Sequence, residues 1–157
     1  MKIEYWAIGK TNEAYLSEGM AIYQKRLPHY LPFHLELLPD IKNAGKLKAN
    51  QLKQKEGEMI LQRLRPGDQL FLLDERGKQY SSRDFASFLE KKLQLSVNRM
   101  VFLSGGAFGF SEAVYQRANG KISLSKMTFS HQMVRLFFLE QLYRGMSILR
   151  GEKYHND

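Results

Sequence analysis

A glycine-rich segment at residues 104–109 has the composition of a ligand-binding turn. It reads Ser-Gly-Gly-Ala-Phe-Gly and follows the apolar run 100–103, which is typical of a buried strand. Glycines adopt left-handed dihedral angles and let backbone amides approach a ligand closely. The segment contains neither G-x-G-x-x-G nor Gly-Lys-Ser/Thr, so the dinucleotide-binding and P-loop patterns do not apply. Taken alone, it indicates either a binding loop or a tight structural turn.

Two acids and two bases stand together after another apolar run. Asp74, Glu75, Arg76 and Lys78 follow residues 69–73, which again have the pattern of a buried strand. Side chains at the carboxyl end of such a strand either line a cleft or form a solvated turn. The composition leaves both interpretations open.

The third such segment is the loop at residues 124–131, which is rich in polar atoms for its length. Ser125, Thr128 and Ser130 supply three hydroxyl groups, and His131 follows directly. Ser130 is also suited to cap a helix, and a histidine in the first helical turn commonly has a packing or capping role. The loop therefore has a functional and a purely structural interpretation.

Strand-like and helix-like stretches alternate along the whole chain and connect these segments. Strand patterns occupy residues 2–8, 33–38, 69–74, 100–103 and 122–125, and helix patterns occupy 12–27, 46–64, 81–93, 111–119 and 130–150. Five strands alternating with five helices predict one α/β domain over residues 1–157, with a mostly parallel sheet and helices on both faces. Ligands bind outside the carboxyl ends of strands in such sheets.

The chain has a strongly basic balance. It carries 24 Lys and Arg against 16 Asp and Glu, which gives a formal net charge of +8 and a pI near 9.7. This surplus favours a polyanionic partner such as nucleic acid, although a solvated basic surface explains it equally well. The segment from residue 42 to residue 55 contains no acidic residue. It either binds phosphate groups or forms a solvated helix face. Its basic residues are Lys42, Lys46, Lys48, Lys53 and Lys55.

Composition excludes several classes of protein. The absence of cysteine excludes a disulfide scaffold, a zinc finger and a thiol nucleophile. The four histidines show no ligand spacing with carboxylates, so no metal is expected. No stretch approaches the roughly 20 apolar residues of a membrane span, and Glu4 interrupts the first apolar run, which argues against a signal peptide. We therefore expect a cytoplasmic protein.

The last predicted helix, residues 130–150, is apolar in almost every direction. A helix of this kind must be covered on all sides, and a five-stranded domain is expected to cover only one face. The other face is therefore predicted to pack against a second copy of the chain, with Gly145 and Ser147 permitting close approach.

Together these segments resemble one known family along nearly the whole chain. The resemblance lies in Leu73-Asp74, the Gly105-Gly106 turn, the run 125–129 with Ser130-His131-Gln132-Met133-x-Arg135 after it, and the tail Arg150-Gly-x-x-Tyr154-His155. This combination resembles the SPOUT-class ribosomal RNA large-subunit methyltransferase H family. The tandem motif at residues 125–135 is its most specific part.

The resemblance implies a fold and an activity that composition and spacing do not reveal. It implies an α/β knot in which the carboxyl-terminal part threads through a loop as a deep trefoil, an exception to the rule against knots. It also implies a homodimer that binds S-adenosylmethionine in the knotted loops. The implied substrate is N3 of a pseudouridine in the helix 69 loop of 23S rRNA, on the assembled 70S ribosome.

The same resemblance indicates which residues perform this function. Transferred position by position, contacts with S-adenosylmethionine fall on Leu73, Gly105, Leu124, Ser125, Lys126, Met127, Thr128 and Phe129. Arg135 and Arg144 are candidates for binding phosphate or stabilising developing negative charge. Tyr154 and His155 are candidates for contacting the target base, as a base or an orienting group.

The sequence is also compatible with two functions other than rRNA methylation. One is a non-catalytic ribosome- or RNA-binding factor that uses only the basic surface, which affinity for S-adenosylmethionine would exclude. The other is a nucleotide-binding α/β enzyme of another chemistry, which the absent phosphate-binding fingerprints disfavour.

Overall fold

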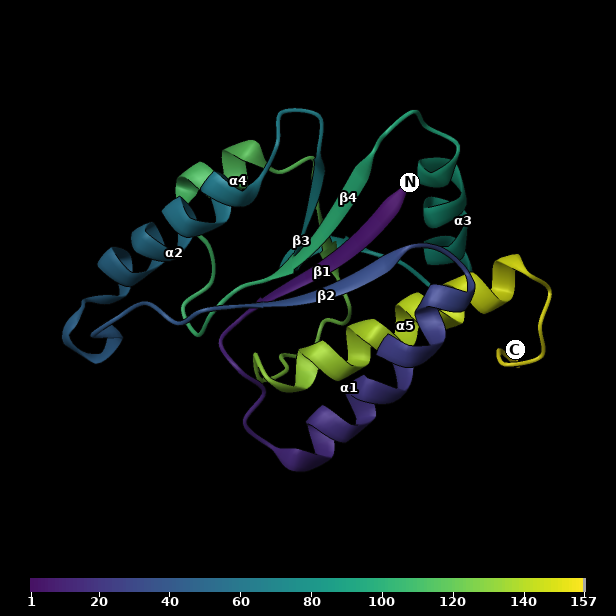
Figure 1. The fold of residues 1–157 in the computed structure, drawn as a ribbon, viewed down its shortest axis with the longest axis horizontal. Coiled ribbons are helices and arrows are strands. Elements are labelled where there is room, and N and C mark those ends of the chain that lie inside the picture. The colour runs from purple at the N-terminus through teal and green to yellow at the C-terminus, as the bar shows by residue number, and fades with distance from the viewer. Residues whose placement is uncertain (157) are drawn as a thin grey trace.

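The computed structural model describes residues 1–156 as a five-stranded sheet flanked by helices (Figure 1). The strands are β1 (Lys2–Ile8), β2 (Phe33–Leu38), β3 (Gln69–Gln79), β4 (Arg99–Ser104) and β5 (Gly120–Ser123). The helices are α1 (Ala14–Arg26), α2 (Ala49–Arg63), α3 (Ser82–Leu93), α4 (Glu112–Arg117) and α5 (Met133–Leu149). Neighbouring strands are all parallel, in the order β2-β1-β4-β3-β5, so the predicted α/β architecture with a parallel sheet is confirmed.

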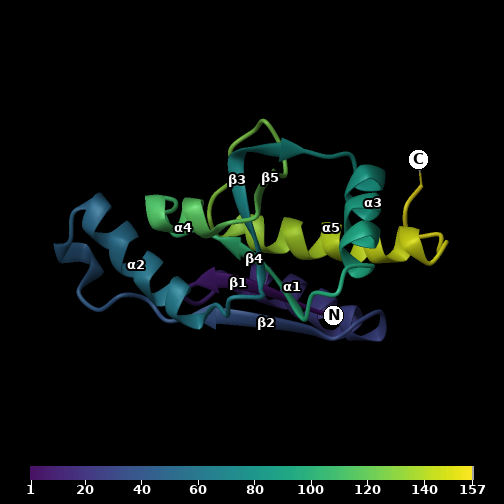
Figure 2. The same cartoon turned by 90° about the horizontal axis from the view of Figure 1, so that it is seen from above.

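Both faces of the sheet are buried, and the alternation of side chains divides the core into two layers. On β1, Ile3, Tyr5 and Ala7 belong to one layer, and Trp6 and Ile8 to the other. Helices α1, α3 and α5 cover the first layer, and α2 and α4 cover the second (Figures 1 and 2). Burial on both faces explains why the central strands are apolar at nearly every position. The expected helices on both faces are therefore confirmed.

The predicted elements are present, and the differences concern their ends. Helix α1 begins at Ala14, two residues after the start of the predicted range 12–27, with Glu13 before it, and no side chain caps its first turn. Helix α3 lies in the predicted range 81–93, and Ser81 caps it, since its side chain accepts a hydrogen bond from the Asp84 backbone N–H at 3.0 Å. Strand β3 extends well beyond its predicted end, and this has consequences for the site described below.

Helix α5 is covered largely by other helices of the same chain. A Cβ added at Gly19 of α1 would lie 2.9 Å from a methyl group of Leu136, and one at Gly145 would lie 2.9 Å from a methyl group of Leu89 in α3. Ser147 is fully buried. The prediction that Gly145 and Ser147 face a second copy is therefore wrong. The two glycines instead let α1 and α3 approach α5 closely within one chain.

We expect Leu139→Ala to lower the free energy of unfolding by about 2–5 kcal/mol, because Leu139 of α5 is fully buried in the first core layer. The matched control is Leu95→Ala. Leu95 is 47% exposed, so its loss should cost less than about 1 kcal/mol. Urea denaturation followed by circular dichroism measures both changes, and equal losses would contradict this assignment of the core.

Candidate functional site

A cavity of about 530 Å³ opens at the carboxyl edge of the sheet, where β3, β4 and β5 end. All three segments singled out in the sequence contribute to its walls. Its volume lies within the roughly 300–1,000 Å³ that is typical of small-molecule sites. The walls combine apolar side chains with hydroxyl and carboxylate groups, so the cavity suits a ligand with both apolar and polar parts.

A bulge in β3 brings charged residues to this cavity. Leu73 and Lys78 both pair with Ile122 of β5, so the residues between them leave the ladder. A Cβ at Gly77 would lie 2.5 Å from the backbone nitrogen of Ile122, so only glycine lets the two strands approach there. The bulge accounts for the unexpected length of β3. It also places the acids after Leu73 on a cavity wall instead of in a solvated turn.

The carboxylate of Asp74 is held in place within this bulge. It accepts hydrogen bonds from the Arg76 backbone N–H at 2.8 Å and from the hydroxyl group of Tyr115 in α4. Burial, together with the hydrogen bond and charge of Asp74, raises the pKa of Tyr115 to about 12. Tyr115 therefore keeps its proton at physiological pH and continues to donate it to Asp74.

The loop at residues 105–109 forms a second wall and is closed by glycines. Gly106 and Gly109 form an isolated antiparallel bridge, in which the Gly109 N–H donates to the Gly106 carbonyl at 3.1 Å. Gly109 has a φ of 84°, in the left-handed region that favours glycine. A Cβ at Gly105 would already lie 3.2 Å from the ring of Phe110. The loop therefore presents mainly backbone to the cavity.

A buried carboxyl group lies against this glycine loop. Glu56 of α2 is only 6% exposed, and a Cβ at Gly106 would lie 2.7 Å from its Oε2. Its Oε1 is buried and has no hydrogen-bond partner among the described residues. Burial, and then the charge of Asp40, raises the pKa of Glu56 to about 7. Glu56 is not among the residues predicted from the sequence, because only the fold brings α2 to the loop.

The third wall is the loop after β5, which is shaped by hydroxyl groups. Ser123 Oγ donates to the Ser125 carbonyl at 2.8 Å, and Ser125 Oγ accepts from the Met127 backbone N–H at 2.9 Å. Thr128 Oγ1 donates to Glu75 Oε2 in the β3 bulge at 3.2 Å. The polar residues of this loop thus fix its path and tie it to the first wall.

The N-cap of α5 is Gln132, not the expected Ser130, and its side chain makes no capping bond. Ser130 lies just before it in the chain, where its Oγ accepts a hydrogen bond from the Met133 backbone N–H at 3.1 Å. His131, for which a packing or capping role was the more favoured interpretation, lines the cavity. The sequence analysis did not include His131 among the ligand contacts.

Seven of the eight residues predicted to contact a cofactor line this cavity, namely Leu73, Gly105, Leu124, Ser125, Met127, Thr128 and Phe129. Lys126 is exposed and does not belong to the lining. Their role as cofactor contacts stays a prediction. The lining also contains residues not predicted to contact a ligand, including Asp74, Glu75, Arg76, Phe108, Tyr115 and His131.

Arg135 of α5 is 1% exposed and binds the end of β1. Its Nη2 donates to the Ile8 carbonyl at 2.6 Å, and its Nη1 donates to the Gly9 carbonyl at 2.8 Å and to Thr11 Oγ1 at 3.1 Å. Burial lowers the pKa of Arg135. Because these donors are used inside the protein, the position of Arg135 does not support the predicted contact with phosphate. The residue anchors α5 to β1.

The other three predicted catalytic residues come together at the carboxyl end of α5. Arg144 Nη1 lies 3.0 Å from His155 Nδ1, and its guanidinium lies over the Tyr154 ring at 4.8 Å. Glu140 Oε1 accepts hydrogen bonds from Arg144 Nη2 at 2.5 Å and from the Tyr154 hydroxyl at 3.1 Å. Burial, and then contacts with Tyr23 and Glu140, raise the pKa of Tyr154. We call Arg144, Tyr154 and His155 with Glu140 the tail cluster.

The cavity and the tail cluster lie at opposite ends of α5. Val134 lines the cavity, whereas Arg144 is ten residues further along the helix, which corresponds to about 15 Å. Figure 1 shows the tail beyond the end of α5 that is remote from the β5–α5 loop. One chain therefore does not bring the predicted cofactor contacts and the predicted catalytic groups together.

Within residues 1–156, no group of three or more His, Cys, Asp or Glu side chains is arranged to hold a metal ion. No helix in this described part of the chain is long and apolar enough to cross a membrane.

We expect Glu56→Gln to change how stability depends on pH. The pKa of Glu56 rises from 4.5 to about 7 on folding, so its stabilising contribution is complete below about pH 4.5 and is lost as the pH rises to about 7. The amide of the variant does not titrate. The free energy of unfolding of the variant should therefore gain about 3 kcal/mol relative to wild type between about pH 4.5 and 8.

Urea denaturation at several pH values measures this difference. The matched control is Glu58→Gln, because Glu58 is exposed on the same helix. A difference between Glu56→Gln and wild type that does not vary with pH would contradict the assignment.

Comparison with known proteins agrees with the resemblance of the motifs. A family model described as a predicted SPOUT methyltransferase matches residues 1–155. The chain is 57% identical over 156 residues to a protein of Cytophaga hutchinsonii, covering 99% of this chain and 100% of that protein. It is 55% identical over 157 residues to one of Parabacteroides distasonis, covering 100% of both, and 55% identical over 156 residues to one of Flavobacterium johnsoniae, covering 99% of both.

All three relatives are named ribosomal RNA large subunit methyltransferase H. The matches extend along the strands, the three cavity walls and the tail. The chain belongs to the SPOUT methyltransferase family, whose members are S-adenosylmethionine-dependent enzymes with the α/β knot fold.

Proposed function

We propose that this chain transfers a methyl group from S-adenosylmethionine to N3 of a pseudouridine in the helix 69 loop of 23S rRNA, on the assembled ribosome in the cytoplasm. The observation that carries the proposal is the cavity in which the motifs shared with the family meet. The names of the three relatives support rRNA as the substrate. The net charge of +8 is in keeping with a polyanionic partner.

The cavity walls suit the parts of the methyl donor. Leu73, Leu124 and Phe129 offer apolar surface to an adenine ring, and the backbone of the β5–α5 loop offers polar groups to its edge. Gly105 lets the loop close tightly, because a Cβ there would lie 3.2 Å from the Phe110 ring and 3.3 Å from the Gly109 backbone. The bound donor supplies an activated methyl group, so the protein needs only to position the reactants and exclude water.

The acceptor nitrogen must lose its proton, which passes to solvent, before it takes the methyl group and leaves the donor sulfur as a thioether. The tail cluster is suited to stabilise the anion that this deprotonation leaves. Arginine has only donors, so Nδ1 of His155 accepts from Arg144 and the imidazole proton lies on Nε2. His155 therefore acts as a hydrogen-bond donor at Nε2 toward the ionised base. Arg144, which is ion-paired with Glu140, holds the imidazole through Nδ1, and Tyr154, packed against the guanidinium, orients both groups.

The separation of the tail cluster from the cavity supports a homodimer in which the tail of one protomer completes the pocket of the other. Apolar side chains at the cavity also support a covering partner, since Phe108 is 57% and Met127 76% exposed. We further propose that the segment after β5 is threaded as a deep trefoil, as the family fold implies. The meeting of the glycine loop and the β5–α5 loop in one cavity supports this.

Incubation with labelled S-adenosylmethionine and 70S ribosomes that lack the modification tests the proposal. We expect label in 23S rRNA at helix 69, and far less when protein-free 23S rRNA replaces the ribosome. Calorimetry separates the enzyme from the alternative of a non-catalytic RNA-binding factor. Absence of both label transfer and donor affinity in the presence of ribosomes would overturn the proposal.

We expect a cavity variant and a tail variant, each inactive as a homodimer, to regain methyltransferase activity when they are combined in one mixed dimer. Gly105→Val forces a side chain against Phe110 and the Gly109 backbone and so distorts the glycine loop of the cavity, and His155→Ala removes the tail donor. Each homodimer should therefore retain less than about a tenth of the wild-type rate. Half of randomly mixed dimers are heterodimers with one intact composite site, so the mixture should show about a quarter of the wild-type rate.

Single-turnover methylation of ribosomes after co-expression of the two variants measures this recovery. Each variant co-expressed with itself is the control. A mixture no more active than its parts would refute the composite site, and an undiminished rate for His155→Ala would refute the role of the tail.

A further inference from the structure

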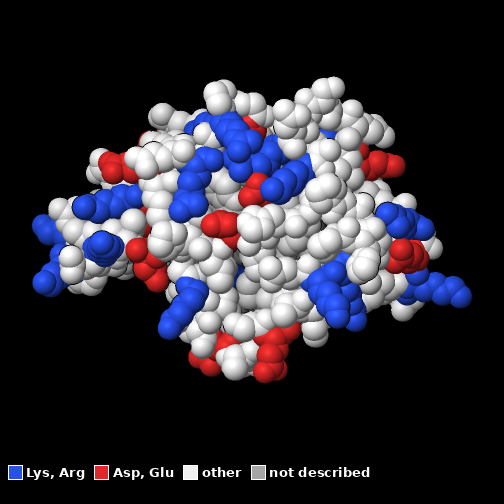
Figure 3. Space-filling model, viewed as in Figure 1, with Lys and Arg blue, Asp and Glu red and all other residues white. Residues whose placement is uncertain are grey.

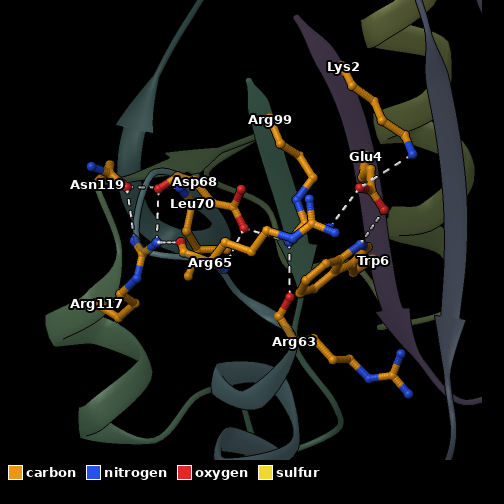
Figure 4. A network of polar contacts seen from close by, with 10 residues as sticks. All are labelled: Lys2, Glu4, Trp6, Arg63, Arg65, Asp68, Leu70, Arg99, Arg117 and Asn119. Carbon is orange, nitrogen blue, oxygen red and sulfur yellow. Dashed lines mark hydrogen bonds and ion pairs between the residues drawn. The ribbon is translucent and has the colours of Figure 1, made fainter. Parts of the chain in front are cut away.

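A basic surface lies at the edge of the sheet opposite the cavity, where the strands begin. We call its five cationic residues, which Figure 4 shows at close range, the arginine cluster, and they are Lys2, Arg63, Arg65, Arg99 and Arg117. They come from β1, the end of α2, the turn before β3, the start of β4 and the end of α4. Figure 3 shows Lys and Arg side chains gathered at the upper centre of this face. The fold thus unites cations that are far apart in the sequence.

Arg99 forms ion pairs with two carboxylates at the centre of the arginine cluster. Its Nη1 binds Glu4 Oε2 at 2.9 Å, and its Nη2 binds Asp68 Oδ2 at 2.5 Å. Both acids are only 5% exposed. The guanidinium also lies 5.3 Å from the centre of the Trp6 ring. The two acids therefore hold Arg99 in position, and its side chain, which is only 13% exposed, is used inside the protein.

Hydrogen bonds to the turn before β3 hold the side chain of Arg117 in place. Its Nη2 donates to the carbonyl groups of Arg65 at 3.1 Å and Asp68 at 2.9 Å, and its Nη1 donates to Asn119 Oδ1 at 3.3 Å. Because these donors are used inside the protein, Arg117 is not itself a phosphate contact, and it stiffens the turn that carries Arg65. The side chain of Arg65 is exposed, and that of Arg63 is 41% exposed with a loose 3.7 Å ion pair to Glu36.

We propose that the arginine cluster binds phosphate groups of the rRNA backbone at a place remote from the methylated base. The inference rests on the proposed function and extends it to a second contact with the same substrate. Five cations stand against three carboxylates, Glu4, Glu36 and Asp68. The exposed side chains of Lys2, Arg63 and Arg65 are the ones that can meet phosphate, while Arg99 and Arg117 are held inside the protein. The planar guanidinium fork matches phosphate oxygens, and arginine is always charged.

The distance between the cavity and the arginine cluster determines what kind of RNA can contact both. Strand β1 has 7 residues at about 3.3 Å each, so the two edges of the sheet lie roughly 20 Å apart. A mononucleotide in the cavity does not reach the arginine cluster. A folded RNA within the ribosome does, and it presents phosphates along its whole surface. The arginine cluster therefore selects for an extended, structured substrate.

The lysines at the start of α2 are the competing basic surface. Lys53 and Lys55 lie eight to ten residues before Arg63 on the same helix, or about 12–15 Å along its axis. They offer the same charge without the fixed guanidinium geometry. Comparing equal charge losses at the two places separates a specific contact from a general effect of net charge.

The test uses Arg63→Gln/Arg65→Gln and, as the matched control, Lys53→Gln/Lys55→Gln. Binding to 70S ribosomes is measured by sedimentation at several salt concentrations without methyl donor. The arginine pair should weaken binding about tenfold and reduce the slope of log affinity against log salt by about 2, whereas the lysine pair should change affinity less than about twofold. Unchanged calorimetric affinity for S-adenosylmethionine verifies that both variants are folded.

Equal weakening by both pairs, or no weakening by the arginine pair, overturns the inference. Methylation by the wild-type protein is measured in parallel. If it occurs while the arginine pair binds as wild type, the second contact is refuted and the proposed function stands. If the wild type transfers no methyl group, the proposed function fails, and the binding data still decide whether the arginine cluster contacts the ribosome.

Discussion

The backbone ladder between β3 and its parallel neighbours β4 and β5 holds every wall of the cavity in place. Because the three strands run in the same direction, the loops that leave them emerge at one edge. The bulge of β3 depends on this ladder as well, since Gly77 passes so close to Ile122 that any side chain would separate the strands. A change in this pairing would move the acids, the glycine loop and the β5–α5 loop together.

Two buried ionisable side chains lie beside the backbone around this edge. Arg135 connects the start of α5 to the carbonyl groups of Ile8 and Gly9, and thereby anchors the loop that precedes the helix. Glu56 lies against Gly106 from the side of α2. Burying charge is costly unless it is paired or hydrogen-bonded. Arg135 meets this condition through carbonyl oxygens, whereas Glu56 responds by a raised pKa of about 7.

The sequence predicts the parts of the fold that depend on local pattern. The alternating apolar residues locate the parallel strands, and the cap at Ser81 locates α3. The bulge of β3, the burial of Glu56 and the covering of α5 depend on contacts with Ile122, Gly106 and α1, which are distant in the sequence. The local sequence around a glycine or a helical acid does not indicate which distant backbone segment that residue will contact. For the same reason the buried position of Arg135 could not be foreseen from its place in a motif.

The two edges of the sheet face ligands of opposite charge. S-adenosylmethionine carries a cationic sulfonium, whereas an rRNA partner requires positive charge on the protein. The cavity contains Asp74 and Glu75 beside Arg76, while the arginine cluster lies roughly 20 Å away at the other edge. The Debye length is about 8 Å at physiological ionic strength. Charge that attracts the RNA therefore contributes little to the potential at the donor, because salt screens it over the length of the strands.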